Sequence, residues 1–207
     1  IQEAPSKRAT LRLEEIPVAL RTLHRGEAMG FVPQREPDIE KGLEILLESL
    51  RQEDIGSTAI TALNRALESP PGERPGVGAY LEAVYDALGQ NPAPRREINA
   101  LLKYFDNEQL TELLQISPSS VQRYARGERN PPEPVVDRIH WLALVVGYLT
   151  GTYNEFGVRR WFERPRTALD GKGPKDALLA DKAWTSESDG ARQVEQLAKA
   201  LIGMPAT

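Results

Sequence analysis

The sequence has no cysteine and only two histidines, His24 and His140, which lie far apart along the chain. The lack of cysteine excludes disulfide bonds, thiolate-bound zinc, iron–sulfur clusters and a cysteine nucleophile. Asp137 stands one helical turn before His140, and such a pair without a third partner is typical of a packed or solvent-facing imidazole rather than of a catalytic base. We therefore expect no enzymatic activity, no metal site and no cofactor.

Long hydrophobic runs are also missing. The longest weakly polar run, residues 139–149, is about half of the roughly 20 residues that a bilayer crossing requires. No secretory signal opens the sequence, although a first residue of Ile1 leaves a processed or earlier start open. We expect a cytoplasmic protein without membrane contact.

Basic residues are in slight deficit and unevenly placed. The 207 residues include 26 Lys or Arg and 30 Asp or Glu, which gives a formal net charge of −4. Residues 1–90 hold 10 basic and 15 acidic side chains, whereas residues 91–207 hold 16 and 15. An anionic partner would therefore prefer the second half of the chain.

Apolar residues recur three or four positions apart over most of the chain, which predicts amphipathic helices. Asp38 and Ser57 are the expected N-caps of two helices, and Gly89 is the expected C-cap of a third. Only residues 9–33 show a weak strand-like alternation. The predicted fold class is mostly α, a multi-helix bundle with at most a short β element near the N-terminus. Prolines and glycines interrupt the pattern at residues 69–76, which predicts a linker.

Residues 106–132, DNEQLTELLQISPSSVQRYARGERNPP, predict two short helices joined by a tight turn. Asp106 or Asn107 is suited to cap the first helix, and Ser117 to cap the second. Gly127 is placed to end the second helix. This is the layout of a helix-turn-helix, in which the second helix enters the major groove of DNA.

The outer face of this second helix carries groups that suit DNA. Gln bonds adenine and Arg bonds guanine in bidentate fashion, while Ser reaches base edges or phosphates. The predicted DNA-binding residues are Ser119, Ser120, Gln122, Arg123, Arg126 and Arg129. One such unit contacts only a short half-site, so we expect a homodimer on a double-stranded DNA operator. Helix pairs with polar outer faces also occur in bundles that never touch DNA, and the alternative is a non-catalytic helical adaptor or assembly protein.

The stretch SPSSVQRYARGERNP, residues 117–131, resembles the Xre/Cro-like group of regulators. Residues 159–179, RRWFERPRTALDGKGPKDALL, look like the C-terminal toxin-binding domain of the Xre/MbcA/ParS-type bacterial antitoxins. The matching positions are Trp161, Phe162, Pro165, Ala168, Leu169, Gly171, Gly173, Pro174, Leu178 and Leu179. The resemblance covers about residues 100–207, and residues 1–90 match nothing in the family.

The resemblance implies a regulator that represses its own operon and neutralises a cognate RES-type toxin, an NAD-degrading enzyme, by covering the toxin's active site. By the same resemblance, surface residues of 186–207 are expected to face the toxin. The predicted toxin-binding residues are Trp184, Arg192, Lys199 and Met204. Trp184 stands in a polar stretch, where it is either an exposed interface anchor or a loop residue folded onto its own domain.

Three domains are expected from these patterns. The first, residues 1–74, is an N-terminal helical extension of unknown role. The second, residues 75–150, is the Xre-like helix-turn-helix domain, and the third, residues 151–207, is the antitoxin-like toxin-binding domain.

Overall fold

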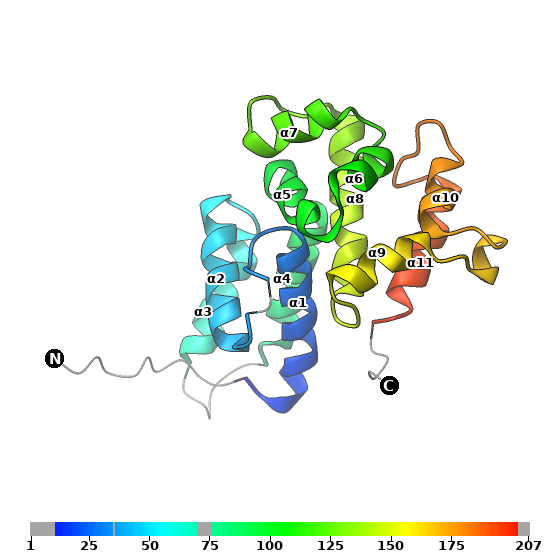
Figure 1. Cartoon of the computed structure of the whole chain (residues 1–207). Coiled ribbons are helices and arrows are strands. Elements are labelled where there is room, and N and C mark those ends of the chain that lie inside the picture. Colours follow the sequence, from blue (N-terminus) through cyan, green and yellow to red (C-terminus); the bar gives the residue numbers. More distant parts are fainter. Residues whose placement is uncertain (1–10, 35, 70–75, 203–207) are drawn as a thin grey trace. The chain divides into compact units, whose positions relative to one another are not determined.

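The computed structural model of the chain describes residues 11–34, 36–69 and 76–202 (Figure 1). Within these ranges it contains eleven α-helices, two short 3-10 helices and no strand, which confirms the mostly-α prediction. The helices divide into two compact units. The described part of the first unit is residues 11–23, 31–34, 36–69 and 76–91, and that of the second is residues 24–30 and 92–202.

The helices are, in chain order, η1 (Leu13–Glu15), α1 (Ile16–Ala28), α2 (Ile39–Gln52), α3 (Ser57–Glu68), α4 (Gly78–Gln90), α5 (Pro94–Tyr104), α6 (Asn107–Leu114), α7 (Pro118–Arg126), α8 (Glu133–Leu149), α9 (Glu155–Glu163), η2 (Thr167–Leu169), α10 (Pro174–Leu179) and α11 (Asp189–Lys199).

The segment with strand-like alternation is helical instead. Residues 13–28 form η1 and α1, and the buried positions Ala19, Thr22 and Leu23 follow helical spacing. Leu13, which the alternation would place inward, is 85% exposed. The expectation of a β element is therefore wrong for the described residues of this segment, because burial there follows the three-to-four period of a helix.

The helix ends of the first unit agree with the sequence at one of three places. The Asp38 carboxylate accepts the backbone N–H of Lys41 at 3.0 Å, so the predicted N-cap of α2 is confirmed. Helix α3 is capped by Gly56 rather than by Ser57, whose hydroxyl bonds the Asp54 carboxylate at 2.6 Å.

Helix α4 passes through Gly89 without ending there. It continues to Gln90, and Asn91 then takes an extended conformation, φ −123° and ψ 95°. Asn91 precedes Pro92, and the proline ring disfavours helical geometry in the residue before it. The stop signal for α4 is thus Pro92 and not the predicted glycine cap.

The core of the first unit consists of leucine-rich faces of α2, α3 and α4. Helix α3 packs against both α2 and α4. Helices α3 and α4 flank the predicted linker, yet they contact each other, and residues 70–75 themselves lie outside the described part. The proline-rich stretch therefore connects two helices of one unit. The division between the units follows Asn91 rather than residue 74.

Helix α8 is the centre of the second unit. It is apolar on nearly all sides, with eleven of its residues buried, which is the pattern of a helix surrounded by others. Helices α5, α6 and α11 pack against it, while α9 and α10 pack against each other and against α5 and α6 respectively. Residues on both sides of the expected boundary at 150 therefore share one core, and the structure does not separate them into two domains.

Candidate functional site

The predicted helix pair is present as α6 and α7, joined by residues 115–117. Asp106 caps α6 by accepting the N–H of Gln109 at 2.8 Å, and Ser117 caps α7 by accepting the N–H of Ser120 at 3.2 Å. Gln115 takes the left-handed conformation, φ 52°, that turns the chain between the helices. Gly127 ends α7 in the same region of backbone space, φ 72°. The predicted caps at Asp106, Ser117 and Gly127 are confirmed.

Helix α7 has a buried side and a polar side. Val121 and Tyr124 are buried in the core of the second unit. Ser119, Gln122, Arg123 and Arg126 lie on the polar side, and Arg129 lies in the turn after it. Ser120 stands one turn before buried Tyr124 and borders the buried side. Ser119, Arg123, Arg126 and Arg129 are exposed, and Ser120 and Gln122 are half-buried.

Several of these polar groups contact one another. Arg123 donates from Nε to the carbonyl oxygen of Ser119 at 3.3 Å. Arg126 forms an exposed ion pair with Glu128 at 3.2 Å, and an exposed pair of this kind contributes little to stability. Gln122 Nε2 lies 3.4 Å from the Asn107 Oδ1, which links α7 to the first residue of α6. Because the arginine contacts are solvent-exposed, both guanidinium groups can exchange them for a ligand at low cost.

Two residues of α5 extend this surface, and the sequence analysis missed them. Asn99 Nδ2 donates to the Ala125 carbonyl in the last turn of α7 at 2.8 Å. The Arg95 side chain lies directly over Gly127, so that a Cβ built on this glycine would come within 2.9 Å of the Arg95 Nε. The sequence signal was the basic pair at 95–96 in the first turn of α5, but only the packing of α5 against α7 places Arg95 beside the DNA-binding candidates.

The C-terminal part of the unit is bonded to α6. Lys175 on α10 pairs with Glu112 at 3.1 Å, and this hydrogen bond raises the pKa of Lys175. Gln115 Nε2, in the turn before α7, donates to the Asp181 carbonyl at 2.9 Å. The helix pair and the segment that resembles a toxin-binding domain therefore form one continuous structure.

Trp184 is a core residue. Its side chain is fully buried, its Nε1 donates to the Leu113 carbonyl at 2.9 Å, and its ring meets that of Trp141 edge to face at 5.0 Å between centroids. Of the two interpretations open from the sequence, the residue folded onto its own domain is correct. Trp184 therefore cannot contact a toxin while this core is intact, and its assignment as a toxin-binding residue is corrected.

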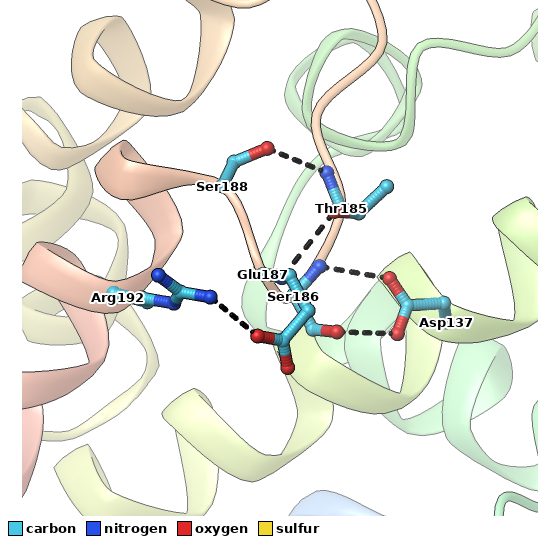
Figure 2. Close-up of polar contacts among 6 residues, drawn as sticks. All are labelled: Asp137, Thr185, Ser186, Glu187, Ser188 and Arg192. Carbon is cyan, nitrogen blue, oxygen red and sulfur yellow. Dashed lines mark hydrogen bonds and ion pairs between the residues drawn. The ribbon is translucent and has the colours of Figure 1, made fainter.

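The segment around Trp184, residues 180–188, is attached to α8 by hydrogen bonds, and we call it the strap. Figure 2 shows Ser186 facing Asp137, whose carboxylate accepts the Ser186 N–H at 2.8 Å and the Ser186 hydroxyl at 2.7 Å. Asp137 is thus engaged with the strap and does not hold His140. The His140 Nδ1 instead lies 2.6 Å from a carboxylate oxygen of buried Glu97.

The remaining predicted toxin-binding residues are distributed differently. Arg192 is exposed and pairs with Glu187 of the strap at 2.6 Å, a contact visible in Figure 2 that raises the pKa of Arg192. Lys199 pairs with Glu195 one turn earlier on α11 at 2.7 Å. Met204 lies outside the described residues. Arg192 and Lys199 are both exposed and stand seven residues apart on α11, so they share one side of that helix, while Trp184 is buried in the core.

No group of three or more His, Asp or Glu side chains within the described ranges is arranged to hold a metal ion. None of the helices described here is both long and apolar enough to cross a membrane. In comparisons with protein-family models, curated proteins and solved structures, nothing matches this chain.

Proposed function

We propose that this chain is an antitoxin-like DNA-binding regulator that represses its own operon and neutralises a cognate RES-type toxin. The observation that supports the DNA-binding half is the arrangement of α6 and α7. Two short capped helices are joined by three residues, and the second presents an exposed polar side opposite a buried one. Residues 117–130 carry three arginines and one glutamate in a chain whose net charge is −4.

In this proposal α7 enters the major groove of the operator. Gln122 and Arg123 lie on the side of the helix that would face the base edges, where bidentate contacts give sequence preference. Arg126 and Arg129 follow at the end of α7 and in the turn after it, beside Arg95, and would contact phosphates. The few basic groups on this surface limit nonspecific affinity and its dependence on salt.

The toxin-binding half rests on the resemblance of residues 159–179. These residues form α9, η2 and α10, and most of the matching positions are in the core, including Trp161, Phe162, Leu169 and Leu178. Most of the residues that carry the resemblance therefore belong to the core, while Pro165, Ala168 and Gly171 are exposed. Contacts with a toxin would come from exposed residues beside and between them.

The first test is DNA binding by the full chain. A labelled duplex from the region upstream of its own reading frame is titrated with protein, and binding is followed by fluorescence anisotropy. Arg123→Ala is expected to weaken specific binding by about 1–3 kcal/mol, because one base contact is lost, with a reduced preference for the operator over unrelated DNA. Arg126→Ala is expected to weaken binding to both duplexes alike.

The matched control is Arg65→Ala, which removes an exposed arginine from α3 in the other unit. It should leave both affinities unchanged. If the unaltered chain binds the duplex and Arg123→Ala binds it with equal affinity and preference, α7 does not read DNA.

The adaptor function is the second candidate, and it is favoured by the internal contacts of Arg123 and Arg126 with Ser119 and Glu128. An adaptor would show no preference for the upstream duplex over unrelated DNA. The same titration therefore separates the two functions. Co-expression with the product of the neighbouring reading frame tests the toxin-binding half independently of DNA.

A further inference from the structure

Helix α9 carries an exposed aromatic residue next to exposed arginines. Phe156 is 62% exposed and lies in the first turn of the helix. Arg160, one turn later, has its guanidinium carbon 5.8 Å from the centroid of the Phe156 ring. Arg164 follows one further turn along as the C-cap residue and is also exposed. We call Phe156, Arg160 and Arg164 the α9 face.

The opposite side of α9 is firmly packed. Val158, Trp161 and Phe162 are buried, and the Phe162 ring meets Phe105 of α5 edge to face at 5.2 Å between centroids. Helix α9 is therefore held in place by its buried side chains. The side chains on its outer side are exposed to solvent and do not pack in the core. Burying an aromatic ring that is exposed in the free chain is a large favourable term in association.

The arginines of the α9 face carry uncompensated charge. Among the described residues, no carboxylate lies within ion-pair distance of Arg160 or Arg164. The nearby Glu163 carboxylate accepts a hydrogen bond from the Gln109 amide at 2.6 Å. Residues 155–175 contain six Arg or Lys against three Asp or Glu, in a chain that is acidic as a whole.

The charged residues of the α9 face differ in their ion pairing from the residues that the sequence predicted to bind a toxin. Arg192 and Lys199 each have a glutamate partner within the chain, and Trp184 is buried. Aromatic residues and arginines are the types most enriched at the centres of protein interfaces. The α9 face combines both types, and its charges remain available to a partner.

DNA is a poor occupant of the α9 face while α7 is on an operator. Helix α7 ends just before α8 begins, and α9 starts just after α8 ends, so the two helices lie at opposite ends of α8 (Figure 1). The 17 residues of α8 span about 25 Å at 1.5 Å per residue. A protein bound over Phe156 at the start of α9 would therefore leave α7 free to contact DNA, whereas the other end of α9 lies beside α6, where Glu163 accepts a hydrogen bond from Gln109.

A second copy of the chain is also a poor occupant. A two-fold symmetric dimer pairs a surface with itself, so an interface on the α9 face would hold Arg160 and Arg164 of both copies, four positive charges in all. Like charges at such an interface are repulsive. The charge of this face fits a different protein with an acidic surface.

We propose that the α9 face is the surface by which this chain binds its protein partner, and that the partner presents an acidic surface with an apolar pocket for Phe156. This inference rests on the proposed function, in which the partner is the cognate toxin. It assigns the contact to the start and the outer side of α9 instead of to α11 and the C-terminal residues.

The test measures the affinity of the full chain for the purified product of the adjacent reading frame by isothermal titration calorimetry. Phe156→Ala and Arg160→Glu are each expected to weaken binding by at least about tenfold, the size typical of central interface residues. Leu13→Ala and Arg65→Glu are matched controls, since they alter an exposed apolar residue and an exposed arginine of the other unit. Both controls should bind like the unaltered chain, and circular dichroism should show all four variants folded.

Each other outcome counts against the proposal in a distinguishable way. Tight binding by the unaltered chain that Phe156→Ala and Arg160→Glu retain overturns the inference and leaves the proposed function standing. No binding by the unaltered chain overturns the toxin-binding function and the inference with it. Loss of DNA affinity, or conversion of a dimer to a monomer, with partner affinity unchanged would assign the face to DNA or to a second copy. Should Arg160→Glu fail to fold, Arg160→Ala replaces it with the same expected direction.

Discussion

Trp184 illustrates how one hydrogen bond fits a polar aromatic residue into a core. A buried indole needs an acceptor for its N–H, and the Leu113 carbonyl supplies it at 2.9 Å. Leu113 is in the last turn of α6, where carbonyl groups have no partner within their own helix. The next carbonyl, that of Leu114, accepts from Arg138 at 2.6 Å. Two side chains from distant parts of the sequence thus donate hydrogen bonds to the last two carbonyl groups of α6.

The contribution of this bond can be measured with Trp184→Phe. The variant removes the donor and leaves the buried Leu113 carbonyl without it, so the free energy of unfolding in urea is expected to fall by about 1–3 kcal/mol, beyond the loss of ring volume. Trp141→Phe is the matched control, because the Trp141 Nε1 is buried without a hydrogen-bond partner. Equal losses for the two variants would show that the Leu113 bond contributes nothing.

His24 is expected to make stability depend on pH. Burial lowers the pKa of His24, so the folded chain keeps this imidazole neutral at a pH where the unfolded chain has already bound a proton. The stability that comes from keeping His24 neutral is fully present above the ordinary pKa of histidine. It is lost as the pH falls through the lower pKa of the folded state. Stability should therefore fall on acidification from about pH 7.5 to about pH 5.5, and His24→Gln should reduce that fall. Urea unfolding of both proteins at the two pH values provides the measurement, and an identical fall would contradict it.

At the scale of elements, two glycines that follow helices, Gly127 after α7 and Gly171 after η2, allow a comparison of backbone conformation with side-chain surroundings. Gly127 and Gly171 both have positive φ, 72° and 79°. No atom lies within 4 Å of a Cβ built on Gly171, whereas one built on Gly127 meets the Arg95 side chain. The two glycines therefore share one backbone requirement and differ in their surroundings.

This contrast gives a paired prediction. Gly127→Ala and Gly171→Ala are each expected to lower the free energy of unfolding by roughly 1–2 kcal/mol, the cost of a left-handed residue with a Cβ. Only Gly127→Ala must also displace Arg95, so only this variant should weaken binding to the upstream duplex. Unfolding in urea and fluorescence anisotropy measure the two effects. Equal DNA affinities for the two variants would show that Arg95 takes no part in DNA binding.

At the scale of the whole molecule, the proposed recognition of an operator is expected to need two copies of the chain. One α7 covers a short half-site, and a dimer covers two. We expect light scattering to give the mass of a homodimer, at least with operator DNA present. A monomer under both conditions would count against operator recognition by α7.

Much of the helical content could be predicted from the sequence. The caps at Asp38, Asp106, Ser117 and Gly127 are local, since each satisfies backbone groups within a few residues of itself. The apolar spacing of α2 and α7 likewise places their buried faces correctly. The failures were also local ambiguities: residues 13–28 alternate weakly over a few positions, and Gly89 resembles a helix cap although Pro92 ends the helix.

Local sequence patterns predicted most of the helical segments and the polar side of α7, because periodicity and capping act over distances of one or two turns. Tertiary structure alone decided that Trp184 is buried, that Glu97 holds His140, and that Arg95 lies beside α7. These contacts join residues separated by many positions, 71 for Trp184 and Leu113 and 43 for His140 and Glu97. Their formation depends on how helices pack, and no local pattern encodes which distant carbonyl or carboxylate a side chain will meet. The same packing left Phe156 and Arg160 exposed, and with them the face proposed to bind a partner.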